Sequence, residues 1–285
     1  MTDLVIGANG LIGSALMGYL DALGTFRNHR ENLLNGKKYR PLDISDSDDV
    51  KDVFDDAKPQ RVFLAAGVAS VDSCETLESD RTNSFGVSNI ITNCDTHGAQ
   101  LIFFSSSYVF DGKSQTPYKP HDPTSPIQRY GRQKEATEKI LLSRDGLQFL
   151  IIRTDAVFGK GNNFVSQVAG AVRAGKKIHV PVDQTVNPVF APDLARTAIH
   201  LSERYSGEIF HVAGNKCVTY YDFAVQIAYK LGCPKPHDLI MGIKLEDMQQ
   251  LARRPQNACL DCKTLEAHAM TVPNLEKGLK KFLES

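Results

Sequence analysis

Tryptophan is absent from the 285-residue chain, and so is any apolar run that approaches the roughly 20 residues needed to span a bilayer. Neither sign of charge is in excess, because Lys plus Arg and Asp plus Glu each number 33. A chain without surplus positive charge is poorly suited to a nucleic acid backbone. Residues 1–7 also lack the basic segment and cleavage site of a signal peptide. We therefore expect a cytoplasmic protein that binds neither nucleic acid nor a membrane.

Cysteine is too scattered to cross-link a small fold through a dense set of disulfides. One C-x-x-C pair occurs, at Cys259 and Cys262, and no second pair at a similar spacing completes a zinc site. We expect inert thiols and no bound metal. The six cysteines are Cys74, Cys94, Cys217, Cys233, Cys259 and Cys262.

The chain does contain an alternation of two kinds of segment. Short apolar runs rich in β-branched residues are typical of buried parallel strands, and longer amphipathic stretches are typical of helices. This alternation predicts an α/β fold, a Rossmann-type doubly wound parallel sheet with right-handed crossovers. Strands are predicted at residues 4–6, 61–66, 101–105 and 147–153, and helices at 11–20, 47–57, 72–97 and 130–142.

The alternation loosens after Thr154. We assign residues 1–155 to an NAD(P)-binding Rossmann domain and 156–285 mainly to a smaller substrate-binding region, with some segments returning to the first domain. Ligands of open α/β sheets bind beyond the carboxyl ends of the strands, so we expect the site there. In the second part, helices are predicted at 164–174, 191–204 and 220–231, and mostly irregular structure at 181–192.

The first strand runs into a helix through a glycine-rich turn, in which Gly7, Gly10 and Gly13 have the spacing G-x-x-G-x-x-G. The first glycine permits the tight turn, the second lets a pyrophosphate approach the backbone, and the third lets the helix pack on the strand. The helix N-terminus adds N–H donors for the phosphates. We therefore expect a dinucleotide here. The other loop residues expected to contact it are Asn9, Leu11 and Ile12.

The residue that binds the adenosine ribose 2′-hydroxyl is usually acidic and lies about 20 residues further on. The second strand is predicted to end without an Asp or Glu, although Glu31 lies just beyond. Arg27, next to Asn28, is suited to a 2′-phosphate, which favours NADP(H), with NAD(H) as the alternative. Asp43, followed by Ile44, is a candidate adenine contact or, alternatively, a helix N-cap.

Tyr130 and Lys134 are spaced Y-x-x-x-K on a predicted helix, so they share one face. A nearby ammonium group stabilises a phenolate, and we expect it to lower the pKa of Tyr130 and make it a general acid–base. Residues 105–107 are three serines after a central strand, and a hydroxyl there is able to bind a substrate carbonyl. The alternatives are a surface tyrosine with a solvated lysine, and a serine turn at the strand end.

Together these motifs resemble the extended short-chain dehydrogenase/reductase family, and within it most closely the dTDP-4-dehydrorhamnose reductases. The resemblance covers nearly the whole chain and includes SSSYVFDG at residues 105–112 and YGRQK at 130–134. Several motifs in the same order are far more specific than any single one. The other matching segments lie at residues 7–13, 65–72, 83–89, 122–126, 153–154, 183–188, 193–194 and 254–261.

The resemblance implies an NADP-dependent reductase that transfers hydride to the C4 ketone of a nucleotide sugar. It implies that Tyr130 donates the proton and that Lys134 supports it and contacts the nicotinamide ribose. Ser106 is implied to hold the carbonyl oxygen. The residues implied to lie against the cofactor after the fourth strand are Ala65, Ala66 and Gly67.

The chain departs from the reductases where the sugar is expected. After the Arg-Thr dipeptide at 153–154 the reductases carry Ser and then an aromatic residue, whereas this chain has Asp155 and Ala156. The usual Asp before Tyr-Val-Phe is Ser107. Without the aromatic wall at Ala156, we expect poor activity on dTDP-4-dehydrorhamnose and better activity on a different 4-keto sugar, or none.

Asn187 and Arg254 are expected to close over the substrate, with Arg254 on a phosphate or, alternatively, in a surface salt bridge. Two other functions remain open. One is a nucleotide-sugar epimerase or dehydratase, although residues 105–107 lack the acidic pair usual in dehydratases. The other is a non-catalytic NADP-binding regulatory subunit, like the β subunit of methionine adenosyltransferase, that binds a catalytic partner subunit. The chain is also a candidate homodimer.

Overall fold

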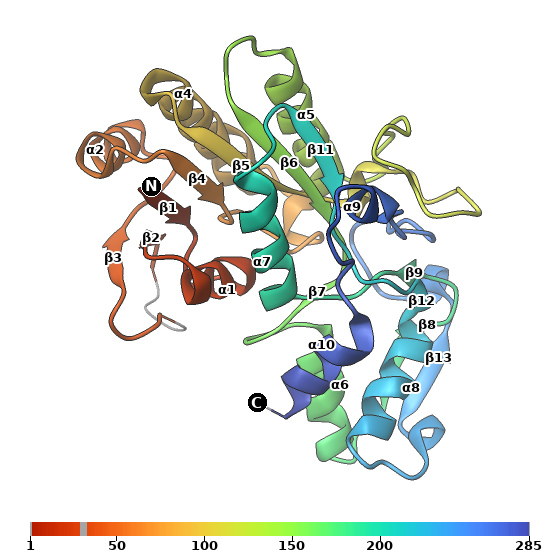
Figure 1. The fold of residues 1–285 in the computed structure, drawn as a ribbon. Coiled ribbons are helices and arrows are strands. Elements are labelled where there is room, and N and C mark those ends of the chain that lie inside the picture. Colours follow the sequence, from red (N-terminus) through yellow and green to blue (C-terminus); the bar gives the residue numbers. More distant parts are fainter. Residues whose placement is uncertain (1, 29–32, 285) are drawn as a thin grey trace.

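Seven parallel strands form the central sheet of the computed structural model, which describes residues 2–28 and 33–284 (Figure 1). From one edge to the other, their order is β3, β2, β1, β4, β5, β6 and β11. The predicted Rossmann-type parallel sheet is confirmed. The strands are β1 (Asp3–Ile6), β2 (Ala22–Phe26), β3 (Lys38–Pro41), β4 (Arg61–Leu64), β5 (Gln100–Ser106), β6 (Phe149–Thr154) and β11 (Glu208–His211).

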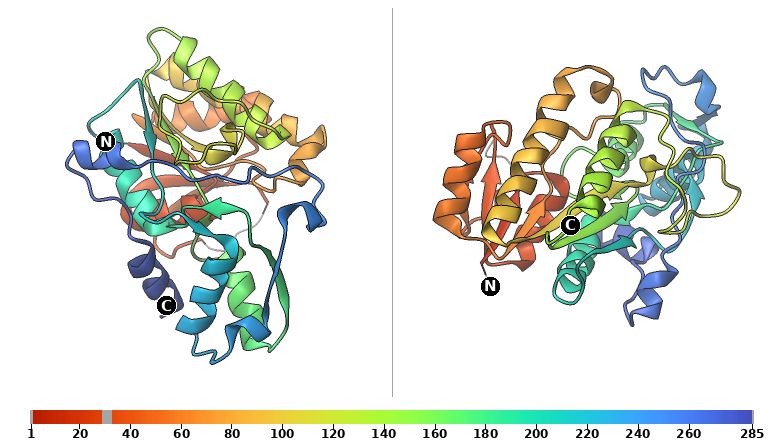
Figure 2. Two further views of the ribbon diagram at one scale, coloured as in Figure 1. Left: turned by 90° about the vertical axis from the view of Figure 1, so that its right-hand side faces the viewer. Right: turned by 90° about the horizontal axis from the view of Figure 1, so that it is seen from above.

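Two helical layers cover the sheet, one on each face (Figures 1 and 2). In β1, Val5 joins the core on one face, whereas Leu4 and Ile6 join the core on the other. Because both faces are buried, the interior strands β1, β4, β5 and β6 are largely apolar runs without polar alternation, whereas the edge strand β3 is partly exposed. One layer contains α1 (Leu11–Tyr19) and α7 (Ala191–Ser202); the other contains α2 (Ser47–Ala57), α4 (Val87–His97) and α5 (Arg129–Ser143).

The segment predicted as one helix at 72–97 is divided into four shorter ones. Gly86 packs against Ile44, where an added Cβ would lie 2.5 Å from the Ile44 side chain. Asn83 accepts from Val68 N at 2.8 Å and donates to Val68 O at 3.0 Å. The backbone is extended at Thr76, which separates η1 from a continuous helical run over residues 78–97, and the π-helical turn in this run lies where Asn83 and Gly86 make these contacts. Its parts are η1 (Ser73–Glu75), α3 (Glu78–Asp80), the π-helical η2 (Arg81–Gly86) and α4.

Most of the chain after Thr154 forms a smaller unit, at the lower right in Figure 1, with a core that includes Phe158, Phe223 and Leu279. β11 and α7 return to the main sheet and its helical layer. Residues 181–192 are more regular than predicted, because β9 pairs with β12 and β10 pairs with β7. The elements are α6 (Phe164–Arg173), α8 (Tyr220–Lys230), α9 (Lys263–Ala267), α10 (Leu275–Leu283), β7 (Val157–Phe158), β8 (Ile178–Pro181), β9 (Thr185–Val186), β10 (Val189–Phe190), β12 (Val218–Thr219) and β13 (Ile240–Ile243). Short 3-10 turns are η3 (Ser107–Val109), η4 (Pro236–Asp238) and η5 (Leu245–Asp247).

Cys217 and Cys259 form a disulfide, so the expectation that all six cysteines are free thiols is wrong for this pair. The two residues are 42 apart in sequence, and the fold brings their Cα atoms to 5.8 Å. Within residues 2–28 and 33–284, no group of three or more His, Cys, Asp or Glu is placed to hold a metal ion. In the same ranges, no helix has the length and hydropathy of a membrane span. The cytoplasmic location stays a prediction.

Candidate active site

A cleft of about 430 Å³ opens at the carboxyl ends of β1, β4, β5 and β6. It brings together Tyr130 and Lys134 from α5, Ser106 from the end of β5, and Tyr220 from α8. A second cavity, of about 200 Å³, shares residues 65–68 with it and extends toward the ends of β2 and β3. The two cavities together form the site that the sequence places beyond the carboxyl edge of the sheet.

The second cavity contains most of the residues expected to bind the adenosine half of a dinucleotide. Leu11 and Ile12 line the larger cleft instead. Gly13 is buried beneath the turn and Asn28 is exposed beyond β2, so within the described chain both lie outside the two linings. The expected residues that line the second cavity are Gly7, Asn9, Gly10, Arg27, Asp43, Ile44, Ala65, Ala66 and Gly67.

The glycine turn has a backbone that side chains would block. Gly7 has φ +85°, and an added Cβ would lie 2.6 Å from Ala66 N. A Cβ on Gly13 would overlap Gly7 O. Gly7 therefore supplies the left-handed turn, and Gly13 permits α1 to pack directly on the end of β1. This cradle leaves backbone N–H groups open to a pyrophosphate.

Asp43 is held by its own loop. Its Oδ1 accepts from Ser45 N at 3.0 Å and from Ser45 Oγ at 2.7 Å. The hydrogen bond from Ser45 lowers the pKa of Asp43, and the charge of Arg27 adds to this effect. The alternative role of Asp43 as an N-cap is wrong for α2, because Asp46 occupies that position and accepts from two backbone N–H groups. Glu31 lies outside the described residues.

The side chains of Tyr130 and Lys134 meet the end of β5. Lys134 Nζ donates to Phe104 O at 2.8 Å and lies 5.7 Å from the centre of the Tyr130 ring. The Ser106 hydroxyl accepts from Tyr108 N at 3.2 Å, and Ser106 lines the same cleft as Tyr130. The fold therefore joins all three residues that the sequence marked as catalytic.

Burial dominates the electrostatics of this set. It raises the pKa of Tyr130 well above its ordinary value, and a hydrogen bond with Ser106 only partly opposes this rise. It lowers the pKa of Lys134 to about 8. The expectation that Lys134 lowers the pKa of Tyr130 is wrong here, because the lost hydration of the phenolate is the larger effect. Tyr130 therefore holds its proton at neutral pH, so a donor proton is present at the end of β5.

Tyr108 forms the next part of the cleft wall. Its ring meets Tyr130 edge-on, with ring centres 6.4 Å apart, and its hydroxyl accepts from Gln184 Nε2 at 3.2 Å. Burial raises the pKa of Tyr108 to about 12. α5 approaches this turn through Gly131, where a Cβ would overlap Tyr108 O. The glycine after Tyr130 is therefore required for the helix to reach the serine turn.

Two departures from the reductase pattern contact each other. Ser107 Oγ donates to Asp155 Oδ1 at 2.8 Å, and both residues are buried. Asp155 Oδ2 accepts from Asn187 N at 2.7 Å. Burial raises the pKa of Asp155 to about 7, while these hydrogen bonds oppose the rise. Ala156 also lines the cleft, in a left-handed conformation with φ +38°.

Asn187 and Arg254 form hydrogen bonds that connect distant segments of the chain. Asn187 Nδ2 donates to Gly214 O at 3.1 Å, and its Oδ1 accepts from Leu260 N at 2.6 Å. Arg254 Nη2 donates to Asp72 Oδ1 at 2.9 Å, which is the salt bridge considered as its alternative role. Neither side chain is among the described residues that line the larger cleft, and their contact with substrate stays a prediction.

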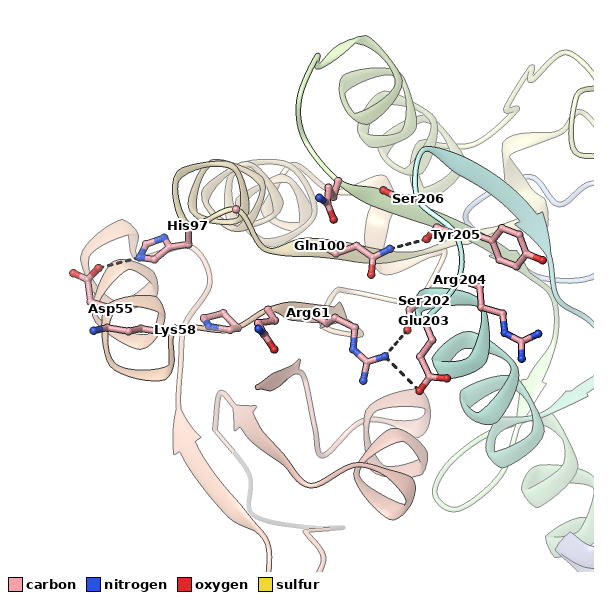
Figure 3. Close-up of a pocket in the computed structure, with 14 residues that line it drawn as sticks. Asp55, Lys58, Arg61, His97, Gln100, Ser202, Glu203, Arg204, Tyr205 and Ser206 are labelled. Carbon is pink, nitrogen blue, oxygen red and sulfur yellow. Dashed lines mark hydrogen bonds and ion pairs between the residues drawn. The ribbon is translucent and has the colours of Figure 1, made fainter. Parts of the chain in front are cut away.

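A groove of about 710 Å³ lies at the opposite edge of the sheet, near the amino ends of β4, β5 and β6 (Figure 3). Several of its charged side chains pair with one another or with nearby residues. Arg61 lies 2.8 Å from Asp3 and 3.7 Å from Glu203, and His97 lies 3.1 Å from Asp55. The sequence motifs converge on the other edge, where ligands of such sheets bind, so this groove is not the candidate site.

A family model described as RmlD substrate binding domain matches residues 1–285. This chain belongs to that family. It is 31% identical over 292 residues to a dTDP-4-dehydrorhamnose reductase of Aggregatibacter actinomycetemcomitans, covering 98% of this chain and 97% of the relative. A crystal structure of a dTDP-4-dehydrorhamnose reductase from Clostridium acetobutylicum is 26% identical, with a TM-score of 0.86 over 100% of this chain and 99% of that one. A Bacillus anthracis reductase solved with NADP, 24% identical, shares the fold with a TM-score of 0.85 over 100% and 99%.

Several residues that line the cleft of this RmlD-family chain have no signal in the local sequence or only a weak one. Tyr220 lines the cleft from the start of α8, with its ring 4.7 Å from that of Phe164, and no local pattern marks it. The contact between Ser107 and Asp155 did leave a signal. Ser107 is a hydroxyl at a position where the reductases carry an acid, and Asp155 is an acid at a position where they carry a hydroxyl. Considered together, these two departures would have predicted a contact between the residues.

Two further hydroxyls line the larger cleft. Ser105 Oγ and Thr154 Oγ1 are buried and have no hydrogen-bond partner within the described part of the chain. A buried hydroxyl without a partner is unfavourable, so these groups are suited to a polar ligand in the cleft.

Proposed function

We propose that this chain is an NADP-dependent reductase of a 4-keto nucleotide sugar. The observation that carries the proposal is the meeting of Ser106, Tyr130 and Lys134 in a cleft that adjoins the glycine turn. Its membership of a family with relatives named as dTDP-4-dehydrorhamnose reductases supports the same chemistry. Residues 1–155 are assigned to the cofactor and 156–285 mainly to the substrate.

The described residues of the nucleotide half fit NADP. The Gly7–Gly13 turn has the close backbone packing that a pyrophosphate requires. Arg27 lines the second cavity at the end of β2, where a guanidinium suits a 2′-phosphate. The unpartnered hydroxyls of Ser105 and Thr154 offer polar contacts in the larger cleft.

When bound, NADPH supplies the hydride. The Ser106 hydroxyl binds the C4 carbonyl oxygen of the sugar and stabilises the negative charge that develops there. Tyr130, which burial keeps protonated, donates its proton to this oxygen, so that the ketone becomes an alcohol. Lys134, fixed by Phe104 O, holds the tyrosine in place and contacts the nicotinamide ribose.

The sugar pocket differs from that of the rhamnose-forming reductases. Ala156 provides no aromatic face, although Tyr220 from α8 is among the aromatic side chains that line the same cleft. A sugar pocket without an aromatic face at the end of β6 covers different faces of the sugar. The chain is therefore proposed to act poorly on dTDP-4-dehydrorhamnose and better on another 4-keto nucleotide sugar.

Consumption of NADPH by the purified chain, followed at the nicotinamide absorbance with a panel of 4-keto nucleotide sugars, tests the proposal. A kcat/KM of about 10⁴ M⁻¹s⁻¹ or more on a member of the panel is expected of a true substrate. Efficient turnover of the rhamnose precursor would show that Ala156 does not restrict the sugar. Tight NADPH binding without any turnover would instead favour a regulatory subunit, which a pull-down for a catalytic partner would identify.

A further inference from the structure

Three segments of the chain meet at the carboxyl group of Asp155. It follows the end of β6 and is only 5% exposed, although it lines the cleft. One oxygen accepts from Ser107 Oγ at 2.8 Å, and the other accepts from Asn187 N at 2.7 Å. The first partner is 48 residues away in sequence and the second is 32 residues away.

The two partners of Asp155 belong to different segments, and of the two segments it is the serine turn that lines the cleft. Ser107 stands between Ser106 and Tyr108, which both line the cleft. Asn187 lies beyond the cleft, and its side chain continues the connection to the backbone of Gly214 and Leu260. Loss of Asp155 would therefore disconnect the serine turn from the Asn187 loop and from the Gly214 and Leu260 backbone that Asn187 holds.

We propose that Asp155 is a positioning residue for the reduction, because it anchors the turn of Ser106 and Tyr108 to the loop of Asn187. The role rests on the proposed function, since it supposes that the sugar lies between the serine turn and the Asn187 loop. Both oxygens of Asp155 are engaged in these two hydrogen bonds, so no proton transfer is assigned to it. Asp155 sets the distance between the carbonyl-binding hydroxyl of Ser106 and the Asn187 loop.

The contacts also define which substitution preserves the anchor. A neutral carboxyl keeps both hydrogen bonds, since a protonated Oδ1 donates to Ser107 Oγ while Oδ2 accepts from Asn187 N. An asparagine has the same shape and the same donor and acceptor pair. Asp155→Asn therefore retains the anchor, and Asp155→Ala removes it. Asp238→Ala, an exposed aspartate in η4, is the matched control.

Steady-state kinetics on the best sugar of the panel separates anchoring from general destabilisation. Asp155→Ala is expected to raise the KM for the sugar at least about tenfold and to leave the affinity for NADPH unchanged within about twofold, with Asp155→Asn restoring most of the loss. A loss of folded protein alone would lower kcat and leave both binding constants as they are. An unchanged KM for the sugar in Asp155→Ala overturns the proposal.

Exchange of the two side chains tests the Ser107 contact directly. Ser107→Asp alone places two carboxyl groups together, and Asp155→Ser alone leaves two hydroxyls. The double variant restores one carboxyl and one hydroxyl with their positions reversed. It is expected to have a kcat/KM above that of either single variant. A double variant no better than the weaker single one contradicts the anchor.

Hydrogen exchange of the Asn187 amide gives a result that does not depend on turnover. This amide donates to Asp155, so its exchange is expected to accelerate in Asp155→Ala and to stay slow in Asp155→Asn. If the wild-type chain reduces no sugar, the proposed function fails and the amide exchange alone decides the anchor. Equal exchange in wild type and Asp155→Ala overturns it.

Discussion

The two halves of the cleft are built in different ways. The cofactor half depends on backbone atoms and missing side chains, as at Gly7 and Gly13, which belong to one short turn. The substrate half depends on side-chain hydrogen bonds between distant residues, such as Ser107 with Asp155. A cradle made of backbone atoms does not depend on the identity of the surrounding side chains. Paired side chains can be exchanged together, which lets the sugar site change while the cofactor site stays the same.

The strongest way to break this comparison is to add a side chain to the cradle. Gly13→Val places a branched side chain against Gly7 O, and we expect NADPH affinity to fall at least about 100-fold, or the fold to be lost. Gly18→Ala is the control on the same helix, because a Cβ there meets no atom within 4 Å. Fluorescence titration and circular dichroism measure the two effects. Wild-type affinity in Gly13→Val would show that the turn does not bind the phosphates.

Tyr130 lies where the two halves of the cleft meet, and its substitution distinguishes the chemical step from cofactor binding. Tyr130→Phe removes the proton donor and is expected to lower kcat roughly 10²- to 10⁴-fold, with NADPH affinity unchanged. Tyr229→Phe, at a 56% exposed position on α8, is expected to behave as wild type. Stopped-flow and steady-state rates with the best sugar provide the measurement. Full turnover by the phenylalanine variant would exclude Tyr130 as the acid.

The substrate half is expected to make stability depend on pH through Asp155. Its pKa of about 7 lies above the ordinary 3.8, so the folded state holds the proton more tightly. The resulting stabilisation is complete below pH about 4 and is lost as the pH rises through about 7. Burial raises the pKa values of Tyr108 and Cys262, which lie near Asp155, to about 12, so they do not titrate in this window.

Asp155→Asn should remove the loss of folding stability that occurs as the pH rises through about 7. A difference of about three in pKa corresponds to roughly 4 kcal/mol, so above pH 8 the variant is expected to exceed wild type by up to that amount. Urea unfolding at pH 5 and at pH 8.5 measures it. Asp238→Asn, which is exposed, controls for the loss of a charge. The same pH dependence in wild type and Asp155→Asn would mean that the carboxyl is ionised throughout.

The smallest expected effect tests the cofactor half of the cleft through its preference for NADPH over NADH. Arg27→Ala should remove the contact with a 2′-phosphate, worth about 1.5–3 kcal/mol, and so reduce the preference for NADPH over NADH roughly 10- to 150-fold. Arg132→Ala, at an exposed position on α5, should leave the preference as it is. Titration of the wild-type chain and both variants with NADPH and with NADH measures the preference. Equal affinities in the wild-type chain would already contradict the assignment of Arg27, without affecting the fold.

Much of the fold was predictable from the sequence, because helix caps and helical faces depend on residues that are close together in the chain. α2 begins at Ser47 and ends at Ala57 as predicted, because Asp46 caps it and the apolar residues repeat with a helical period. Tyr130 and Lys134 were paired correctly because four residues along a helix return to the same face. The motif resemblance then supplied the family and the proposed activity.

Tertiary structure alone decided what distant residues do to one another. Residues 72–97 do not form one regular helix, because the backbone is extended at Thr76 and the helix has a π-helical turn where Asn83 and Gly86 meet loops from other parts of the chain. The pKa of Tyr130 rises, although its helical neighbour is a cation, because burial is set by everything packed around it. The sequence by itself determined backbone turns, helical faces and the cofactor cradle, which depend on near neighbours. Packing determined the substrate wall, since hydrogen bonds and desolvation arise only between groups that the folded chain brings together.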